Sequence, residues 1–264
     1  MKLKNIPKKN INQLISFFKS FKDAEIDNLI KASTFKDLSL NEKMYASNNP
    51  YKPQLNDLYR LYEYIVQNKR LCVLEFGCGW SSLIINKAIL KNKENFEKKT
   101  FNIRQFNKFK HFVVDNDQKF INLSKKRLPK NNISKFLYSD CRLKEISNSI
   151  SFQFDKLPNI CPDFIYIDGP DLFKIKGRSS NLTFNNPDRI PILSDILKLE
   201  YQLLPGTIIL FDGRTTNARF LKDHLKRKWE YIHDVKNDQN ILFLNEKPIG
   251  KHNLNQLKLY GFLK

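Results

Sequence analysis

Cysteine is scarce in this sequence, and its scarcity argues against two ways of holding a chain together. The four cysteines, Cys72, Cys78, Cys141 and Cys161, are spread along 264 residues without a close pair. A disulfide framework or a structural zinc site would need paired or clustered thiols. The cysteine usage fits a reducing compartment, and we expect a cytoplasmic protein.

Long apolar runs are also missing. No run approaches the roughly 20 residues that span a bilayer, so no membrane span is expected. The opening residues MKLKN are followed by further polar residues, so no secretory signal is expected. Hydrophobic residues still make up 41% of the chain and aromatic residues 12%. That is enough apolar material for a core, and it excludes a wholly disordered chain.

Acidic residues are outnumbered, with 27 Asp and Glu against 46 Lys and Arg, which gives a net charge of +19. A polyanionic partner would explain such a surplus. An AT-rich codon bias would explain it too, since Lys exceeds Arg and Asn, Ile and Phe are abundant; we favour this explanation. The most concentrated stretch, residues 91–110, holds seven basic and two acidic residues. It reads as an inserted loop that is either a local basic patch or a solvated excursion.

The spacing of apolar residues predicts an α/β chain. Two or three short helices are expected within residues 11–46, followed by a helix over 55–67. Strands are then predicted at 71–76, 111–115, 136–140, 164–168 and 207–212, with helices after the first strand to about residue 90 and at 118–128, 194–204 and 216–228. Residues 229–233 and 240–244 flank a polar linker and suit a hairpin. Such alternation predicts a Rossmann-like, doubly wound, mostly parallel seven-stranded sheet with a C-terminal antiparallel hairpin.

Acidic residues recur at the ends of the predicted strands. Asp115, Asp140, Asp168 and Asp212 each end a strand, and Glu75 lies just inside the end of the first. Ligands of such sheets bind at the carboxyl ends of the strands. Because charged groups are costly at buried strand ends unless they are partnered, five acids on one edge indicate a polar ligand.

The turn after the first strand carries the strongest local signal. It reads Glu75-Phe76-Gly77-Cys78-Gly79-Trp80-Ser81-Ser82, and it contains two of only eight glycines. Glycines after a strand let the backbone turn tightly and approach a ligand. A dinucleotide fingerprint would need a third glycine where Ser82 stands and an acid about 20 residues later. An acid before Gly-x-Gly instead resembles the first motif of the class I S-adenosylmethionine (SAM)-dependent methyltransferases.

This resemblance implies a set of cofactor contacts. Glu75, the Gly77–Gly79 backbone and Ser81 would cradle the amino-acid end of SAM. Val113-Val114-Asp115 resembles the motif whose acid holds the ribose hydroxyls, which suits a carboxylate that can accept two hydrogen bonds; Asp117 is a neighbouring alternative. Ser139-Asp140-Cys141 resembles the motif that contacts the adenine amine.

The later strands resemble the branch related to catechol O-methyltransferase, through Ile167-Asp168-Gly169 and through Pro205-Gly206 before Asp212. In that branch two Asp and a following Asp or Asn hold a divalent metal. Gly213 stands in the third position, so we expect no metal, because hard cations need several oxygen ligands. Asp168, Asp212 and Asp171 are then expected to face the acceptor, with Asp168 or Asp212 orienting or deprotonating its hydroxyl.

Residues 171–193 form a long link at the same edge. They read either as a substrate loop, with Arg178 and Arg214 as anion or sugar contacts, or as a plain polar loop. The resemblance covers about residues 56–245. We therefore expect an N-terminal helical extension over 1–55 and a methyltransferase domain over 56–264.

The chain looks most like uncharacterised bacterial methyltransferases that tailor small molecules or polysaccharides. The resemblance implies an enzyme that uses SAM to methylate an oxygen of a small molecule or saccharide. Two alternatives stay open. The charge favours a nucleic-acid methyltransferase, although an Asn-Pro-Pro-Tyr-type motif is missing. A non-catalytic SAM- or nucleotide-binding protein with the same fold is the other.

Overall fold

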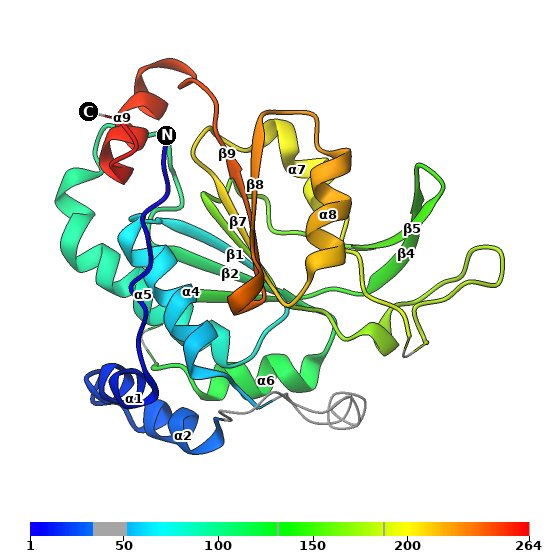
Figure 1. The fold of residues 1–264 in the computed structure, drawn as a ribbon, viewed down its shortest axis with the longest axis horizontal. Coiled ribbons are helices and arrows are strands. Elements are labelled where there is room, and N and C mark those ends of the chain that lie inside the picture. Colours follow the sequence, from blue (N-terminus) through cyan, green and yellow to red (C-terminus); the bar gives the residue numbers. More distant parts are fainter. Residues whose placement is uncertain (34–51, 131, 187, 264) are drawn as a thin grey trace.

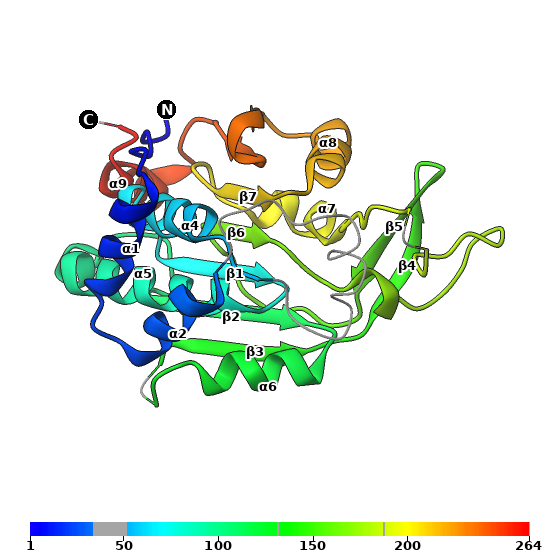
Figure 2. The same ribbon diagram turned by 60° about the horizontal axis from the view of Figure 1, so that its bottom comes forward.

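The computed structural model describes residues 1–33, 52–130, 132–186 and 188–263. Seven strands form one central sheet in the order β3-β2-β1-β6-β7-β9-β8 (Figures 1 and 2). The strands are β1 (Cys72–Phe76), β2 (Lys110–Asp115), β3 (Ser134–Tyr138), β6 (Phe164–Ile167), β7 (Ile208–Asp212), β8 (Trp229–Asp234) and β9 (Gln239–Leu244). Strand β9 runs antiparallel to both of its neighbours, and the other neighbouring pairs are parallel. This topology confirms the predicted fold class.

Helices cover both faces of the sheet (Figure 2). One face packs against α4 (Leu55–Gln67) and α5 (Trp80–Phe96), and α6 (Gln118–Lys126) lies beside β2 and β3. The other face packs against α7 (Asp195–Leu199), α8 (Thr215–His224) and a separate hairpin of β4 (Cys141–Ile146) and β5 (Ser149–Phe154). No helix in the described part of the chain is long and apolar enough to cross a bilayer.

Strand parity decides which side chains meet at the carboxyl edge. Successive strand residues point to opposite faces, and Phe76 lies in the core on the α7–α8 side while Tyr166 lies in the core on the α4–α5 side. By the same alternation Glu75, Asp168 and Asp212 belong to the α4–α5 side. The first turn of α4 therefore faces the carboxylates of β6 and β7.

The N-terminal helices α1 (Ile11–Lys19) and α2 (Ala24–Ala32) confirm two of the short helices that the sequence predicts. Asn10 and Gln13 close a capping box at the start of α1. The Phe17 ring lies 5.0 Å from the ring of Tyr59 and 5.3 Å from that of Tyr62, so α1 packs on α4. The third helix, expected before residue 46, lies outside the described residues, and the domain division at residue 55 stays a prediction.

One predicted helix boundary was wrong, one predicted strand is shifted, since β3 ends at Tyr138 and Asp140 follows it, and two elements were missed. Helix α5 continues to Phe96, so residues 91–96 are helical and the inserted segment is shorter than expected. The hairpin β4–β5 was missed because β4 alternates exposed charged residues with half-buried ones and lacks a continuous apolar run. Helix α9 (Gly250–Tyr260) was missed because only four of its residues are buried, and two of those are polar.

A buried polar cluster joins α9 to the sheet. The Asp163 carboxylate accepts hydrogen bonds from the backbone N–H groups of Leu71 and Cys72 and from the Tyr260 hydroxyl. The Arg70 guanidinium is fully buried and lies 3.9 Å from the centroid of the Tyr260 ring. This buried polar cluster thus links α9 to the starts of β1 and β6.

Candidate functional site

The glycines of the first turn differ in what surrounds them. Gly77 has φ +87°, and a Cβ there would lie 2.4 Å from the Cα of Gly169, in the turn after β6. The two turns are therefore in backbone contact, which no side chain at either position would permit. At Gly79, by contrast, a Cβ would come no nearer than 4.0 Å to another described atom, the Ser81 Oγ. As far as the described residues go, the space beside Gly79 is therefore open.

Glu75 is buried beneath the start of α5. Its two carboxylate oxygens accept hydrogen bonds from Ser81 Oγ at 2.5 Å and from Ser82 Oγ at 2.6 Å. The His111 Nε2 lies 3.1 Å from the second oxygen. Glu75 has no exposed surface. Its hydrogen bonds to the two serines hold the start of α5 in place. The predicted contact of Glu75 or Ser81 with a cofactor stays a prediction.

Asp115 lies at the end of β2, beside the Gly turn. Its carboxylate accepts hydrogen bonds from the N–H groups of Cys78 at 2.8 Å and of Asp117 at 2.7 Å. Burial raises the pKa of Asp115 to about 6, although these two N–H groups favour its charged form. The next residue, Asn116, is 6% exposed, and its side-chain oxygen accepts no hydrogen bond from the described residues. A buried acceptor without a donor calls for an explanation, and a polar ligand that reaches it is one.

Two lysines of one segment hold the other acids of this edge. Lys174, at the end of a short 3-10 helix (Leu172–Lys174), forms an ion pair with Asp117, the predicted alternative to Asp115. Lys176 lies 2.7 Å from the Asp140 carboxylate, which also accepts from the Tyr138 hydroxyl at 3.0 Å. Lys176 and then Tyr138 lower the pKa of Asp140. We call residues 172–176 the strap. Its ion pairs could not be predicted from sequence patterns, because they depend on the course of a loop.

Three carboxyl groups meet across the ends of α4, β6 and β7: Asp57, Asp168 and Asp212. Burial, and then the charges of Asp212 and Asp168, raise the pKa of Asp57 to about 8. Asp168 is exposed, although the surrounding protein and then the charge of Asp212 raise its pKa to about 8. Burial raises the pKa of Asp212 to about 6 against the hydrogen bond that the Tyr166 hydroxyl donates at 3.0 Å. At neutral pH the three groups therefore share protons.

Asp57 is the residue that sequence reasoning missed. It stands on a helix that precedes the Gly turn, and only the packing of α4 on the sheet brings it to β6 and β7. One turn later, Arg60 donates to Gln239 at 2.7 Å and pairs with Asp234 at 2.7 Å. Gln239 is fully buried and its amide group favours the charged form of Asp212. Helix α4 therefore both supplies an acid and positions the residues around Asp212.

Gly213 stands where the catechol-type branch carries its third metal ligand. Gly213 has φ +59°, and a Cβ there would lie 3.3 Å from a carboxylate oxygen of Asp238, in the turn before β9. An acid from the hairpin thus stands beside the position where the catechol-type branch carries Asp or Asn. Within the described residues, no group of three or more His, Cys, Asp or Glu side chains has an arrangement that could hold a metal ion.

The remaining predicted residues are placed as follows. Arg214 donates to the backbone oxygen of Asp168 at 2.6 Å, which puts its guanidinium at the carboxylate cluster. Asp171 accepts from the Phe173 N–H and caps the short helix after it. Arg178 is exposed, just beyond Lys176, which pairs with β4. The segment that follows extends beside the hairpin, away from the central sheet (Figures 1 and 2). No described contact brings Arg178 to Asp168 or Asp212, and its role as a substrate contact stays a prediction.

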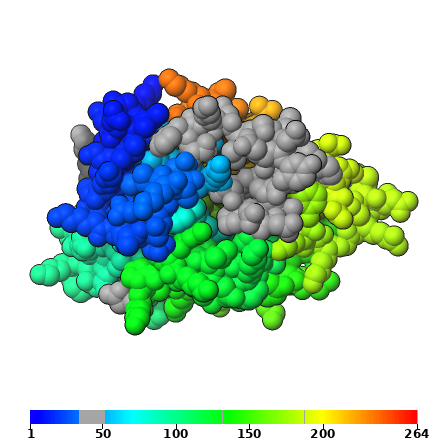
Figure 3. Space-filling view, turned by 90° about the horizontal axis from the view of Figure 1, so that it is seen from below, coloured from blue at the N-terminus to red at the C-terminus, as the bar shows by residue number. Residues whose placement is uncertain are grey.

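The N-terminal helices and the segment after β6 lie far apart on the surface. In the space-filling view of Figure 3, α1 and α2 (blue) and the yellow-green segment after β6 lie at opposite ends of one face. Helix α6 (green) forms part of the surface below them.

Comparisons with known proteins find similarity to solved structures alone, two of which are described here. No family model matches the chain, and no curated protein matches it. The methyltransferase PaMTH1 of Podospora anserina, solved with S-adenosylhomocysteine (SAH), shares 12% identity over 92% of this chain and 100% of its own, with a TM-score of 0.44. The O-methyltransferase TomG of Streptomyces achromogenes, involved in tomaymycin synthesis and solved with SAM, shares 10% identity over 86% of this chain and 98% of its own, with a TM-score of 0.43.

Proposed function

We propose that this chain, whose sheet has the strand order of class I SAM-dependent methyltransferases, transfers the methyl group of SAM to a hydroxyl group of a small molecule or saccharide. The observation that carries the proposal is the carboxyl edge of β1 and β6. There a glycine turn with open space at Gly79 stands beside a cluster of proton-sharing carboxyls.

The residues of the edge fit SAM as cofactor. The space beside Gly79 would take the amino-acid part, with the start of α5 held in place by Glu75 through Ser81 and Ser82. Asp115 and the unpaired oxygen of Asn116 would face the ribose hydroxyls. When bound, SAM supplies an activated methyl group, so the protein mainly has to align the acceptor and exclude water.

The carboxyl cluster would handle the acceptor proton. Asp212, with a pKa of about 6, is mostly ionised at neutral pH and can accept the hydroxyl proton as the oxygen attacks. Asp168 and Asp57, with pKa values of about 8, mostly keep their protons and can donate hydrogen bonds to neighbouring oxygens of the acceptor. A cluster that both accepts and donates hydrogen bonds suits a hydroxyl-rich acceptor.

One observation favours a second candidate, a protein that keeps the fold without methyl transfer. The acids predicted to contact the nucleoside, Asp117 and Asp140, are engaged by Lys174 and Lys176 of the same chain. If these ion pairs persist in solution, they oppose nucleoside binding at this edge.

Calorimetric titration with SAH tests the proposal. Wild-type protein should bind SAH, and Gly79→Ala should lose that binding while it unfolds at nearly the wild-type temperature, because the added methyl group meets only the open space. Repeating the titration with magnesium tests whether Asp238 completes a metal site. Absence of SAH binding by the wild type would overturn the proposal, and binding without methyl transfer to any hydroxyl acceptor would favour the second candidate.

A further inference from the structure

The amino end of the sheet presents an exposed aromatic and basic loop. We call residues 98–110 the basic-aromatic loop. Phe101 is 80% exposed and Phe106 is 100% exposed. Phenylalanine has no polar atom, so two rings held in water on one short loop are unfavourable unless something covers them.

The charge of this loop has a single sign. It contains five basic residues and no acid. Lys98, Lys99 and Arg104 are exposed and make no ion pair with the described residues. Two lysines of neighbouring elements lie near this charge: burial, and then the charges of Lys4 and Lys99, lower the pKa of Lys69.

The loop is held in place by the rest of the chain. The backbone oxygen of Asn102 accepts a hydrogen bond from Asn255 of α9 at 3.0 Å. Gln105 donates to the backbone oxygen of Cys161 at 3.0 Å. These anchors lie between Phe101 and Phe106, so both rings are presented from a fixed base.

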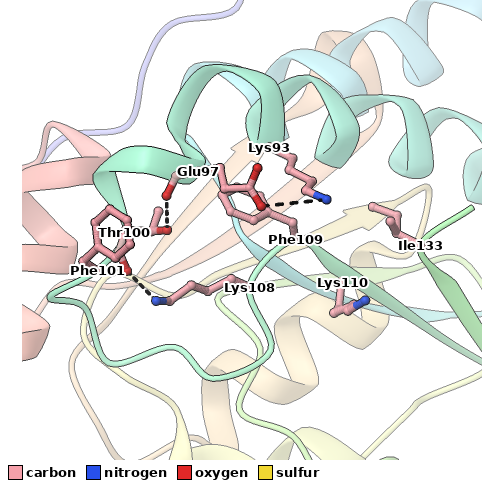
Figure 4. Close-up of a pocket in the computed structure, with 8 residues that line it drawn as sticks. All are labelled: Lys93, Glu97, Thr100, Phe101, Lys108, Phe109, Lys110 and Ile133. Atoms are coloured by element: carbon pink, nitrogen blue, oxygen red, sulfur yellow. Dashed lines mark hydrogen bonds and ion pairs between the residues drawn. The ribbon is translucent and has the colours of Figure 1, made fainter.

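A cavity of about 350 Å³ lies beside the loop (Figure 4). Its lining consists of three apolar side chains, three lysines, one threonine and one acid: Phe101, Phe109, Ile133, Lys93, Lys108, Lys110, Thr100 and Glu97. Lys93 pairs with Glu97, and Lys108 donates to the backbone oxygen of Thr100, which leaves Lys110 without an ion pair among the described residues. Apolar walls with ammonium groups at their rim suit an anionic headgroup attached to an apolar chain.

We propose that the basic-aromatic loop binds the surface of a lipid bilayer that contains anionic lipids. The exposed rings would enter the interface and the lysines would meet the headgroups, the combination by which peripheral proteins hold a membrane. Single-stranded nucleic acid is also recognised by basic and aromatic side chains. The bilayer is favoured because a fully exposed ring such as Phe106 has no protein surface behind it to serve as a stacking platform.

Attachment at this end leaves the candidate site accessible. The loop joins α5 to the start of β2, whereas Asp115 stands at the other end of that strand. A bilayer against the amino end would therefore leave the carboxyl edge facing away from the lipid.

Vesicle co-sedimentation of the full chain tests the proposal. Wild type should sediment with vesicles of phosphatidylcholine that contain about one third phosphatidylglycerol and not with phosphatidylcholine alone. The double variant Phe101→Ala/Phe106→Ala should bind roughly tenfold more weakly, and Lys98→Glu/Lys99→Glu should lose most binding. Because these side chains are exposed, neither change should affect the unfolding temperature.

Matched controls come from other surfaces. Val235→Ala removes apolar surface from a residue that is 75% exposed near β8, and Lys144→Glu/Lys222→Glu repeats the charge change at exposed positions of β4 and α8. Both should bind like the wild type. Equal binding to the two kinds of vesicle, or unchanged binding by the double Phe variant, would overturn the proposal. The proposal would also be overturned if the protein did not bind vesicles but bound labelled polyuridylate in a way that depends on Phe101 and Phe106.

Discussion

The two ends of the central sheet carry ionisable groups of opposite kind. At the carboxyl end, Asp212 and Asp168 raise the pKa of Asp57, and Asp212 raises the pKa of Asp168. At the amino end, residues 98–110 carry five basic side chains and no acid. The net charge of +19 is a sum over the whole chain and does not reveal the acids gathered at the carboxyl end. The sign of a site thus depends on which residues the strand ends bring together, and a total over the chain does not reveal it.

The largest effect is expected from removing the base at the acidic end. Asp212→Asn cannot accept the acceptor proton, and we expect kcat to fall by roughly 10²- to 10⁴-fold. Methyl transfer to any acceptor found for the wild type is the measurement, and wild-type activity should rise with pH through about 6, as Asp212 ionises. Lys98→Glu/Lys99→Glu, at the basic end, should leave transfer to a soluble acceptor unchanged. An equal loss in both variants would remove the functional distinction between the ends.

A second test compares one glycine from each end. Gly77→Ala would bring a methyl group against the Gly169 backbone in a left-handed conformation, and we expect the free energy of unfolding to fall by about 3 kcal/mol or more. Gly206, before β7, also has a positive φ, but a Cβ there would meet the movable end of the Leu257 side chain. Gly206→Ala should lower the free energy of unfolding by about 1–2 kcal/mol. Urea titration of both variants is the measurement. The reverse order would contradict the backbone contact at the carboxyl end.

The crowding of acids predicts a pH dependence of stability. The pKa of Asp57 is raised from an ordinary 3.8 to about 8, so between these values the folded chain holds more protons than the unfolded one. The free energy of unfolding should therefore fall as the pH rises from about 4 to about 8. Asp57→Asn should reduce this slope and gain about 1 kcal/mol at pH 8, after allowance for solvent screening. Asp223→Asn, at an exposed position on α8, is the control and should keep the wild-type slope.

The smallest effect concerns the strap. If Lys174 competes with a nucleoside for the carboxyl edge, Lys174→Ala should bind SAH a few-fold more tightly than the wild type, in a calorimetric titration. Lys226→Ala, at a distant position after α8, should bind as the wild type does. Weaker binding by Lys174→Ala would instead make this lysine a ligand contact.

The strand–turn–helix order could be predicted because the five parallel strands are mostly apolar and are followed closely by an acid or a glycine turn. The same patterns located Glu75, Asp115, Asp168 and Asp212 at one edge of the sheet. Asp57 could not be found this way, because a helix residue reaches that edge only through the packing of α4 on β6 and β7. Strap contacts such as Lys174 with Asp117 were equally hidden, since they depend on the path of a loop.

The buried cluster of Asp163, Arg70 and Tyr260 has a consequence for synthesis of the chain. Tyr260 follows Asp163 by 97 residues, which takes a ribosome about 5 to 20 s to add. During that time the Asp163 carboxylate lacks the hydrogen bond from the Tyr260 hydroxyl. Burying a charged group without all of its partners is unfavourable. The pairing of β1 with β6 therefore gains its full stability only after α9 has been made, so the centre of the sheet is among the last parts of the nascent chain to become stable.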